Sequence, residues 1–328
     1  MRPALRLLLL ALLVVGAVLV GIRLGAVPLG VREIIDAVRG DGDPTTVAIV
    51  QQLRFPRAVL AALVGGSLAA SGATFQALLR NPLAEPYVLG VSGGAAVGAV
   101  TAVVLGAAAA GGMAVSAAAF GGAVLAMVLV LRIAASVGRT LDTRILLLAG
   151  VVVGAFFNAC ILLALTFADT ESFRSAIFWM MGSFSGASWR EIGALAAAAV
   201  PALIVLIALA RPLNLLSVGE ETAAYLGVRT ERVKLIAYGT ASLLTAASVA
   251  ASGVIGFVGL VIPHVVRMLW GGDHRFLIPA SVLLGATFLV LADALARVAA
   301  APTELPIGVV TAFVGVPFFV WLLRRRPA

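Results

Sequence analysis

Residues 213–229 read LNLLSVGEETAAYLGVR, a short polar stretch set between two long apolar runs. The runs, residues 191–210 and 233–252, are each about as long as a helix that crosses the hydrocarbon core of a bilayer, which takes roughly 20 residues. A polar connection between two spans has to lie at a face of the membrane, because lipid offers exposed polar groups no partners. The stretch therefore predicts a chain that crosses the membrane before it and again after it.

The same stretch is predicted to form two short helices. Gly219 separates them and Gly227 ends the second, since glycine commonly ends helices in the left-handed conformation. Ser217 is expected to cap the second helix, because Glu220 follows three residues later as in a capping box. A helix lying on lipid usually has more Lys and Arg and larger apolar residues, so docking into a groove of a partner protein is the preferred interpretation. The small apolar face expected to dock consists of Ala223, Ala224 and Leu226.

The composition of the whole chain is that of a polytopic membrane protein. Of its 328 residues, 62% are apolar and 12% are charged, far from the averages of soluble domains. The 23 lysines and arginines are scattered singly between apolar runs, so the net charge of +8 indicates orientation on a membrane and not binding of nucleic acid. We predict an all-α fold with a single transmembrane domain, residues 1–328, and about ten membrane helices. The expected spans are roughly residues 4–22, 57–79, 88–108, 112–134, 143–167, 191–210, 233–252, 255–271, 276–298 and 306–323.

The distribution of positive charge predicts the sidedness. An even number of spans puts both termini on one side, and most of the lysines and arginines then lie on that side. The positive-inside rule makes it the cytoplasmic side, so residues 213–229 are expected to face the cytoplasm. Two connections on the other side, residues 28–54 and 171–188, have apolar residues at helical spacing and are expected to form helices at the outer interface.

The sequence lacks a motif that could hydrolyse a nucleotide. The one lysine, Lys234, stands between Val233 and Leu235 and so cannot belong to the Gly-Lys-Ser/Thr of a P-loop. Neither histidine has further ligands at metal-binding spacing, and the one cysteine, Cys160, has no internal disulfide partner. We therefore predict no catalytic residue, no cofactor and no resident metal.

Two other functions have some support in the sequence. Asp293 is the one acidic residue inside an apolar span, as an ion-gradient-driven secondary transporter would require. Arg297 follows it at i+4, so a local ion pair is the simpler account. The string GVSG at residues 90–93 is found at the nucleophile of rhomboid-type intramembrane serine proteases, but such strings arise easily in Gly-rich spans.

Residues 213–229 and several other stretches resemble the iron-chelate and cobalamin permease family, the membrane subunits of type II ABC importers. The other stretches are NPLAEP (81–86) followed by LGVS (89–92), GFVGLVIPH (256–264) and ELPIGVVTA (304–312). They keep the order of the family and are spread over nearly the whole chain. The resemblance implies the permease subunit of a binding-protein-dependent importer in the inner membrane. Its substrate would be a metal chelate, namely a ferric siderophore, haem or cobalamin.

The resemblance also implies partners and site residues. The partners are a second permease copy, identical or a paralogue, two ABC ATPase subunits, and a periplasmic or lipid-anchored substrate-binding protein, all in or on membrane lipid. A cytoplasmic gate is implied for Asn81, Leu83 and Thr143, and docking of the binding protein for Arg54, Arg57 and Arg297. The residues implied for coupling to the ATPase are Ser217, Gly219, Glu220, Glu221, Thr222, Ala223, Ala224, Leu226 and Gly227.

Overall fold

The structure, a computed structural model, describes residues 3–25, 29–107, 111–137 and 142–324. Every regular element in these ranges is a helix, which confirms the all-α prediction. Seven helices are long and apolar enough to cross a membrane, and three shorter apolar helices complete the ten positions expected from the sequence. In chain order, the helices at these positions are α1 (Pro3–Arg23), α4 (Phe55–Leu78), α5 (Val91–Val104), α6 (Gly112–Val137), α7 (Thr143–Thr166), α9 (Trp189–Ala208), α12 (Thr230–Ser252), α13 (Val258–Trp270), α14 (His274–Val298) and α15 (Ile307–Arg324).

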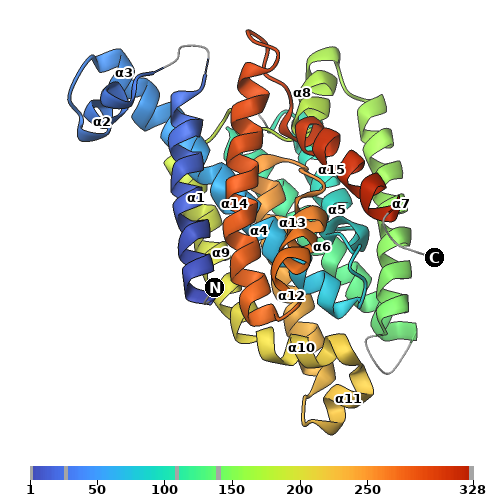
Figure 1. The fold of residues 1–328 in the computed structure, drawn as a ribbon. Helices are drawn as coiled ribbons and strands as arrows, with labels where there is room; N and C mark the ends of the chain where they lie inside the picture. The colour runs from blue at the N-terminus through green and yellow to red at the C-terminus, as the bar shows by residue number, and fades with distance from the viewer. Residues whose placement is uncertain (1–2, 26–28, 108–110, 138–141, 325–328) are drawn as a thin grey trace.

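Short helices lie at opposite ends of this bundle (Figure 1). At one end, which we call the coupling end, are α10 (Ala210–Val218) and α11 (Glu220–Tyr225). At the opposite end are α2 (Val31–Arg39), α3 (Pro44–Ala48) and α8 (Thr170–Met180). Helices were predicted in both of these long connections, and the structure confirms them. A π-helix between α3 and α4 continues the first connection directly into its span.

α4 forms the centre of the bundle, with most of its length buried between α14, α12 and α13. Such close packing depends on glycine, because lipid exerts no hydrophobic force that would press helices together. Gly65 of α4 lies against the backbone of Gly285 in α14, and Gly72 lies against that of Gly259 in α13. A Cβ atom at either position of α4 would overlap a carbonyl oxygen of the neighbouring helix. The glycines therefore set the distances between the central helices.

The chain is not helical between α12 and α13, and this break is held by the loop that follows α4. The hydroxyl of Tyr87 donates to the carbonyl of Ile255 at 2.7 Å and accepts from its N–H at 3.1 Å. Oε1 of Glu85 accepts from the N–H of Phe257 at 2.7 Å. Phe257 has a φ of 68°, an uncommon conformation for a bulky residue, and α13 begins directly after it. The two side chains thus replace the helical hydrogen bonds that the break removes, as burial within a membrane protein requires.

Candidate functional site

The coupling segment consists of α10, α11 and the turn that follows them. Gly219 separates the two helices, as predicted. The prediction for Gly227 is also confirmed, since it ends the second helix in the left-handed conformation with a φ of 83°. Its N–H binds the carbonyl of Ala224, and the N–H of Val228 binds that of Ala223, the pattern of a Schellman motif. The turn is therefore closed by backbone hydrogen bonds alone.

The prediction that Ser217 caps the second helix is wrong. The residue at the N-cap of α11 is Gly219, and no side chain caps that helix. α10 continues to Val218, so Ser217 is itself helical, and its hydroxyl donates to the carbonyl of Asn214 at 2.7 Å. Serine inside a helix commonly bonds back to the preceding turn in this way, which removes the hydroxyl from any capping role.

The apolar face of α11 is divided between the chain's own interior and the surface. Ala223 is fully buried within the chain itself, and its part in docking stays a prediction. Ala224 is exposed, as are Tyr225 (91%) and Leu226 (62%). Tyr225 was not predicted as a site residue, although a lone aromatic side chain in a polar stretch was an available signal. The exposed apolar residues at this point are Ala224, Tyr225 and, at the C-cap, Leu226, and we call them the exposed face of α11.

An ion cluster connects the start of α11 to two other parts of the chain. Oε2 of Glu220 lies 2.8 Å from Nζ of Lys234 in α12, which also lies 2.7 Å from Oε1 of Glu231. Only 4% of the Lys234 side chain is exposed, and a buried ammonium group is tolerated only when it is paired. The other oxygen of Glu220 lies 3.9 Å from the guanidinium of Arg80, in the turn after α4. Glu220 thus contacts both α12 and the turn that contains the predicted gate.

The predicted gate residues lie at or near a cleft of about 840 Å³ at the coupling end. Thr143, at the start of α7, lines the cleft together with Arg80 and the first turn of α11. Its hydroxyl donates to the carbonyl of Leu78 at 3.4 Å. Asn81 and Leu83 follow Arg80 in the turn, where Oδ1 of Asn81 accepts from the N–H of Leu83 at 3.0 Å. The structure therefore brings Thr143 beside the coupling helix, while the gating role of the three residues stays a prediction.

Asn214 fixes α10 to the start of α14. Its Nδ2 donates to Oδ1 of Asp273 at 2.7 Å, and its Oδ1 accepts from the N–H of His274 at 2.8 Å. The hydrogen bond from Asn214, supported by the N–H of Arg275, holds the pKa of Asp273 below its usual range. This residue was not predicted as part of the site. The available signal was an amide side chain flanked by leucines in a short helix.

Two of the three arginines predicted to dock a binding protein cap α1. The last four carbonyls of a helix have no partner within it, and a positive charge near them is favourable because the helix dipole is negative at that end. Arg54 and Arg297 each supply two hydrogen bonds to this end of α1. The bonds run from Arg54 to the carbonyls of Ile22 (2.9 Å) and Arg23 (3.3 Å), and from Arg297 to those of Gly21 (2.7 Å) and Leu24 (2.8 Å).

These contacts give Arg54 and Arg297 a structural role within the chain. Both are largely buried, 8% and 9% exposed, and their part in docking a binding protein stays a prediction. Asp293 pairs with Arg297 at 3.2 Å, which confirms the predicted local ion pair. It also binds the third arginine, Arg57, at 2.9 Å, and Arg57 in turn binds Glu304 at 2.9 Å. The i+4 spacing predicted the pair of Asp293 and Arg297, but it could not reveal the partners of Arg54 and Arg57.

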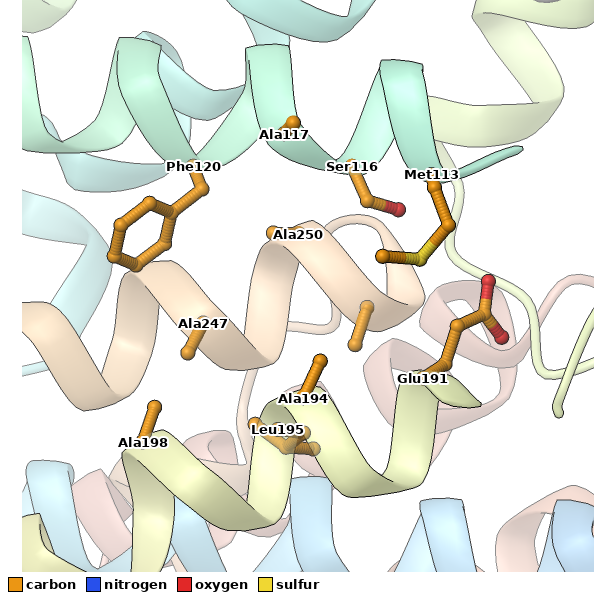
Figure 2. Close-up of a pocket in the computed structure, with 11 residues that line it drawn as sticks. Met113, Ser116, Ala117, Phe120, Glu191, Ala194, Leu195, Ala198, Ala247 and Ala250 are labelled. Carbon is orange, nitrogen blue, oxygen red and sulfur yellow. The ribbon is translucent and has the colours of Figure 1, made fainter. Parts of the chain in front are cut away.

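A separate apolar cavity of about 260 Å³ lies between α6, α9 and α12 (Figure 2). Glu191 stands toward one end of the cavity and Phe120 toward the other, with alanine side chains from α9 and α12 between them. None of the predicted gate, coupling or docking residues lines it. Within the described part of the chain, no group of three or more His, Cys, Asp or Glu residues is placed to hold a metal ion.

Comparison with known proteins shows which family the sequence matches. Residues 10–325 match the sequence model of the FecCD transport family. The chain is 46% identical over 282 residues to the cobalamin import system permease protein BtuC of Halobacterium salinarum, covering 86% of this chain and 75% of that protein. It is 43% identical to the vitamin B12 import system permease protein BtuC of Escherichia coli, with coverage of 86% and 85%.

A solved structure has the same fold over the full length of the chain. It is described as an inward-facing conformation of an ABC transporter of the metal-chelate type. The TM-score is 0.89 at 32% identity, and the match covers 99% of this chain and 100% of the other. The similarity therefore includes the helices at both ends of the bundle as well as the spans.

Proposed function

We propose, from the premise that this chain belongs to the FecCD transport family, that its substrate is a corrinoid of the vitamin B12 type. The chain is the permease subunit of an ABC importer, a multi-pass protein of the inner membrane, and ATP is hydrolysed by a separate subunit. The observation that supports the substrate is that two relatives, 46% and 43% identical, are named as permeases for cobalamin and vitamin B12. Ferric siderophores and haem are the competing chelates.

The permease of such an importer works with an ATPase, a substrate-binding protein and a second permease. We propose that two identical copies of this chain surround the pathway, with one ATPase subunit beneath each. A paralogue in place of the second copy is the alternative. The coupling end then faces the cytoplasm and the ATPase, and the opposite end receives the binding protein.

We further propose that the exposed face of α11, Ala224, Tyr225 and Leu226, docks into the ATPase. A movement of α11 would reach the predicted gate through Glu220, which holds the buried Lys234 and approaches Arg80 in the gate turn. Asn81, Leu83 and Thr143 would then open or close the pathway as the ATPase cycles between its states.

We propose that Arg57 takes part in docking the binding protein, while the same role for Arg54 and Arg297, which bind the end of α1, stays a prediction. Its side chain is 13% exposed, and its guanidinium group already holds Asp293 and Glu304. Glu304 is 47% exposed, so an acidic group of the binding protein would have to displace it or bind beside it. Rim contacts of this kind act more on association rate than on affinity.

Replacing Glu220 by glutamine is expected to reduce coupling while leaving assembly intact. The amide keeps the shape of the side chain but removes the negative charge that Glu220 places 2.8 Å from Nζ of the buried Lys234. Residues that carry coupling between sites typically change it by about 0.5–2 kcal/mol, so we expect ATP turnover stimulated by the binding protein to fall roughly 2- to 30-fold. The comparison variant is Glu221→Gln, because Glu221 was implied for coupling as well and lies in the same turn but forms no ion pair with the described residues, so the difference between the variants isolates the ion pairs of Glu220. Equal stimulation in the two variants would contradict the coupling role of Glu220.

The function itself is tested by transport into proteoliposomes. Permease, ATPase and binding protein are reconstituted together, and uptake of cobalamin is compared with that of a ferric siderophore and of haem. We expect cobalamin to accumulate only when ATP and the ATPase are both supplied. Accumulation of another chelate would replace the substrate and leave the importer assignment unchanged. Uptake by the permease alone, driven by an ion gradient, would contradict the ATP-driven mechanism.

A further inference from the structure

A groove of about 490 Å³ lies between α6 and α12 at the coupling end. Its apolar lining is contributed by both helices, and Val128 and Leu235 are 41% and 49% exposed. Four residues separate the end of α11 from the start of α12, which places the start of α12 beside the coupling helix. The groove therefore combines an exposed apolar surface with a position next to the coupling helix. Its lining consists of Val128, Leu131, Arg132, Ala135, Glu231, Arg232 and Leu235.

The charges of the groove favour an anion. Arg132 and Arg232 are both exposed, and neither forms an ion pair with any residue that the structure describes. Glu231 also lines the groove, but its carboxylate is bound to Lys234 at 2.7 Å. Two guanidinium groups from different helices thus remain available beside an apolar surface. A guanidinium fork matches the oxygens of a phosphate and can hold them with two hydrogen bonds.

We propose that this groove is a binding site for an anionic phospholipid of the cytoplasmic leaflet. Arg132 and Arg232 hold the phosphate of the headgroup, and an acyl chain lies along Val128, Leu131 and Leu235. Basic pockets between membrane helices on the cytoplasmic side suit anionic headgroups, because charge and acyl chain are recognised together. Lipid binding in this groove does not depend on the identity of the substrate, so an experiment that contradicts one of the two proposals leaves the other unchanged.

The position of the groove ties the lipid to coupling. Glu231 lines the groove and binds Lys234, and Lys234 binds Glu220 at the start of α11. A bound headgroup is therefore separated from the coupling helix by two ion pairs. Anionic lipid in this groove is expected to support the ATP turnover that the binding protein stimulates.

The proposal is tested on the permease–ATPase complex taken from bilayers of phosphatidylcholine and phosphatidylglycerol in equal parts. Retained phosphatidylglycerol is measured by native mass spectrometry for the wild type and for Arg132→Gln combined with Arg232→Gln. Each basic residue near a membrane surface raises the affinity for anionic lipid roughly fivefold. The loss of both arginines should therefore lower retention of phosphatidylglycerol roughly 30-fold. The control is Arg6→Gln, a half-buried arginine in α1 away from the groove, which should retain the lipid normally.

A second variant tests the acyl chain. Val128→Trp fills the part of the groove where the acyl chain lies and leaves both arginines in place, so it should also reduce retention of phosphatidylglycerol. Normal retention in the double arginine variant would overturn the proposal. Normal retention in the tryptophan variant, with loss in the arginine variant and displacement by inorganic phosphate, would mean a simple anion site and would overturn it too. If the double arginine variant retains phosphatidylglycerol normally but no longer binds the ATPase, the two arginines belong to a protein interface and the lipid proposal is wrong.

Discussion

Replacing Asp293 by asparagine is expected to destabilise the permease by about 3–5 kcal/mol. Asp293 is 2% exposed and lies between two guanidinium groups, those of Arg57 at 2.9 Å and Arg297 at 3.2 Å. Asparagine has nearly the same volume, so the substitution opens no cavity and changes the charge alone. It leaves the buried Arg297 and the largely buried Arg57 without their shared carboxylate, and removing one partner of a buried pair is far more costly than losing an exposed one.

Thermal unfolding of the purified permease in detergent measures this effect. Glu304→Gln is the matched control, because Glu304 binds the same arginine but is 47% exposed, and its loss should change stability by less than about 1 kcal/mol. The experiment also separates two views of Asp293. If the variant is as stable as the wild type and has lost transport, the acid serves a transported ion and the structural account is wrong.

Replacing Tyr225 by alanine is expected to remove most of the permease's affinity for its ATPase. Tyr225 is 91% exposed in the isolated chain and stands between Ala224 and Leu226 on the exposed face of α11. A tyrosine at the centre of an interface is a common hot spot, and truncation of such a residue costs at least about 2 kcal/mol, or roughly 30-fold in affinity. The fold should be unaffected, because the side chain contributes little to the interior of the permease.

Co-purification and titration of the ATPase onto the reconstituted permease measure this loss. Phe167→Ala is the control, since Phe167 is 76% exposed and lies after α7. It should leave ATPase binding unchanged. Unaltered binding in the Tyr225 variant would place the exposed face of α11 against lipid or water, the alternative that composition alone had disfavoured.

The spans could be predicted from the sequence because their signal is local. The length of an apolar run can be counted in the sequence, and about twenty residues are enough to cross the bilayer. Each of the ten expected positions contains a helix. The length of α13 could not be predicted in this way. The break before it depends on Tyr87 and Glu85, which reach Ile255 and Phe257 from a loop about 170 residues away in the chain. Because the hydrogen bonds that stabilise the break come from residues so far away in the chain, the local sequence pattern does not indicate where the helix stops.

The site residues show the same difference between features set by the local sequence and features set by distant contacts. The helix ends at Gly219 and Gly227 could be predicted because a glycine in a turn has its effect through its own backbone conformation, which the local sequence shows. The face of α11 was only partly predicted, since a helix of six residues is too short for its pattern to show which side is buried. The contacts of Arg54 with the end of α1 could not be predicted, because these partners lie some thirty residues earlier in the chain. The local sequence around a long side chain does not show whether it meets a partner protein or a helix end.

The capping of α1 also has a consequence for how the protein is made. α1 is synthesised before both of the arginines that bind its last carbonyls, and Arg297 comes 276 residues after Gly21. While the intervening helices enter the bilayer one by one, those carbonyls have to stay at the water boundary, where solvent can satisfy them. Arg54 can bind this end of α1 soon after it is made, but the bonds from Arg297 form only when α14 has been inserted. The first and one of the last helices are therefore joined in a late step of assembly, which makes the complete transmembrane domain the unit that becomes stable.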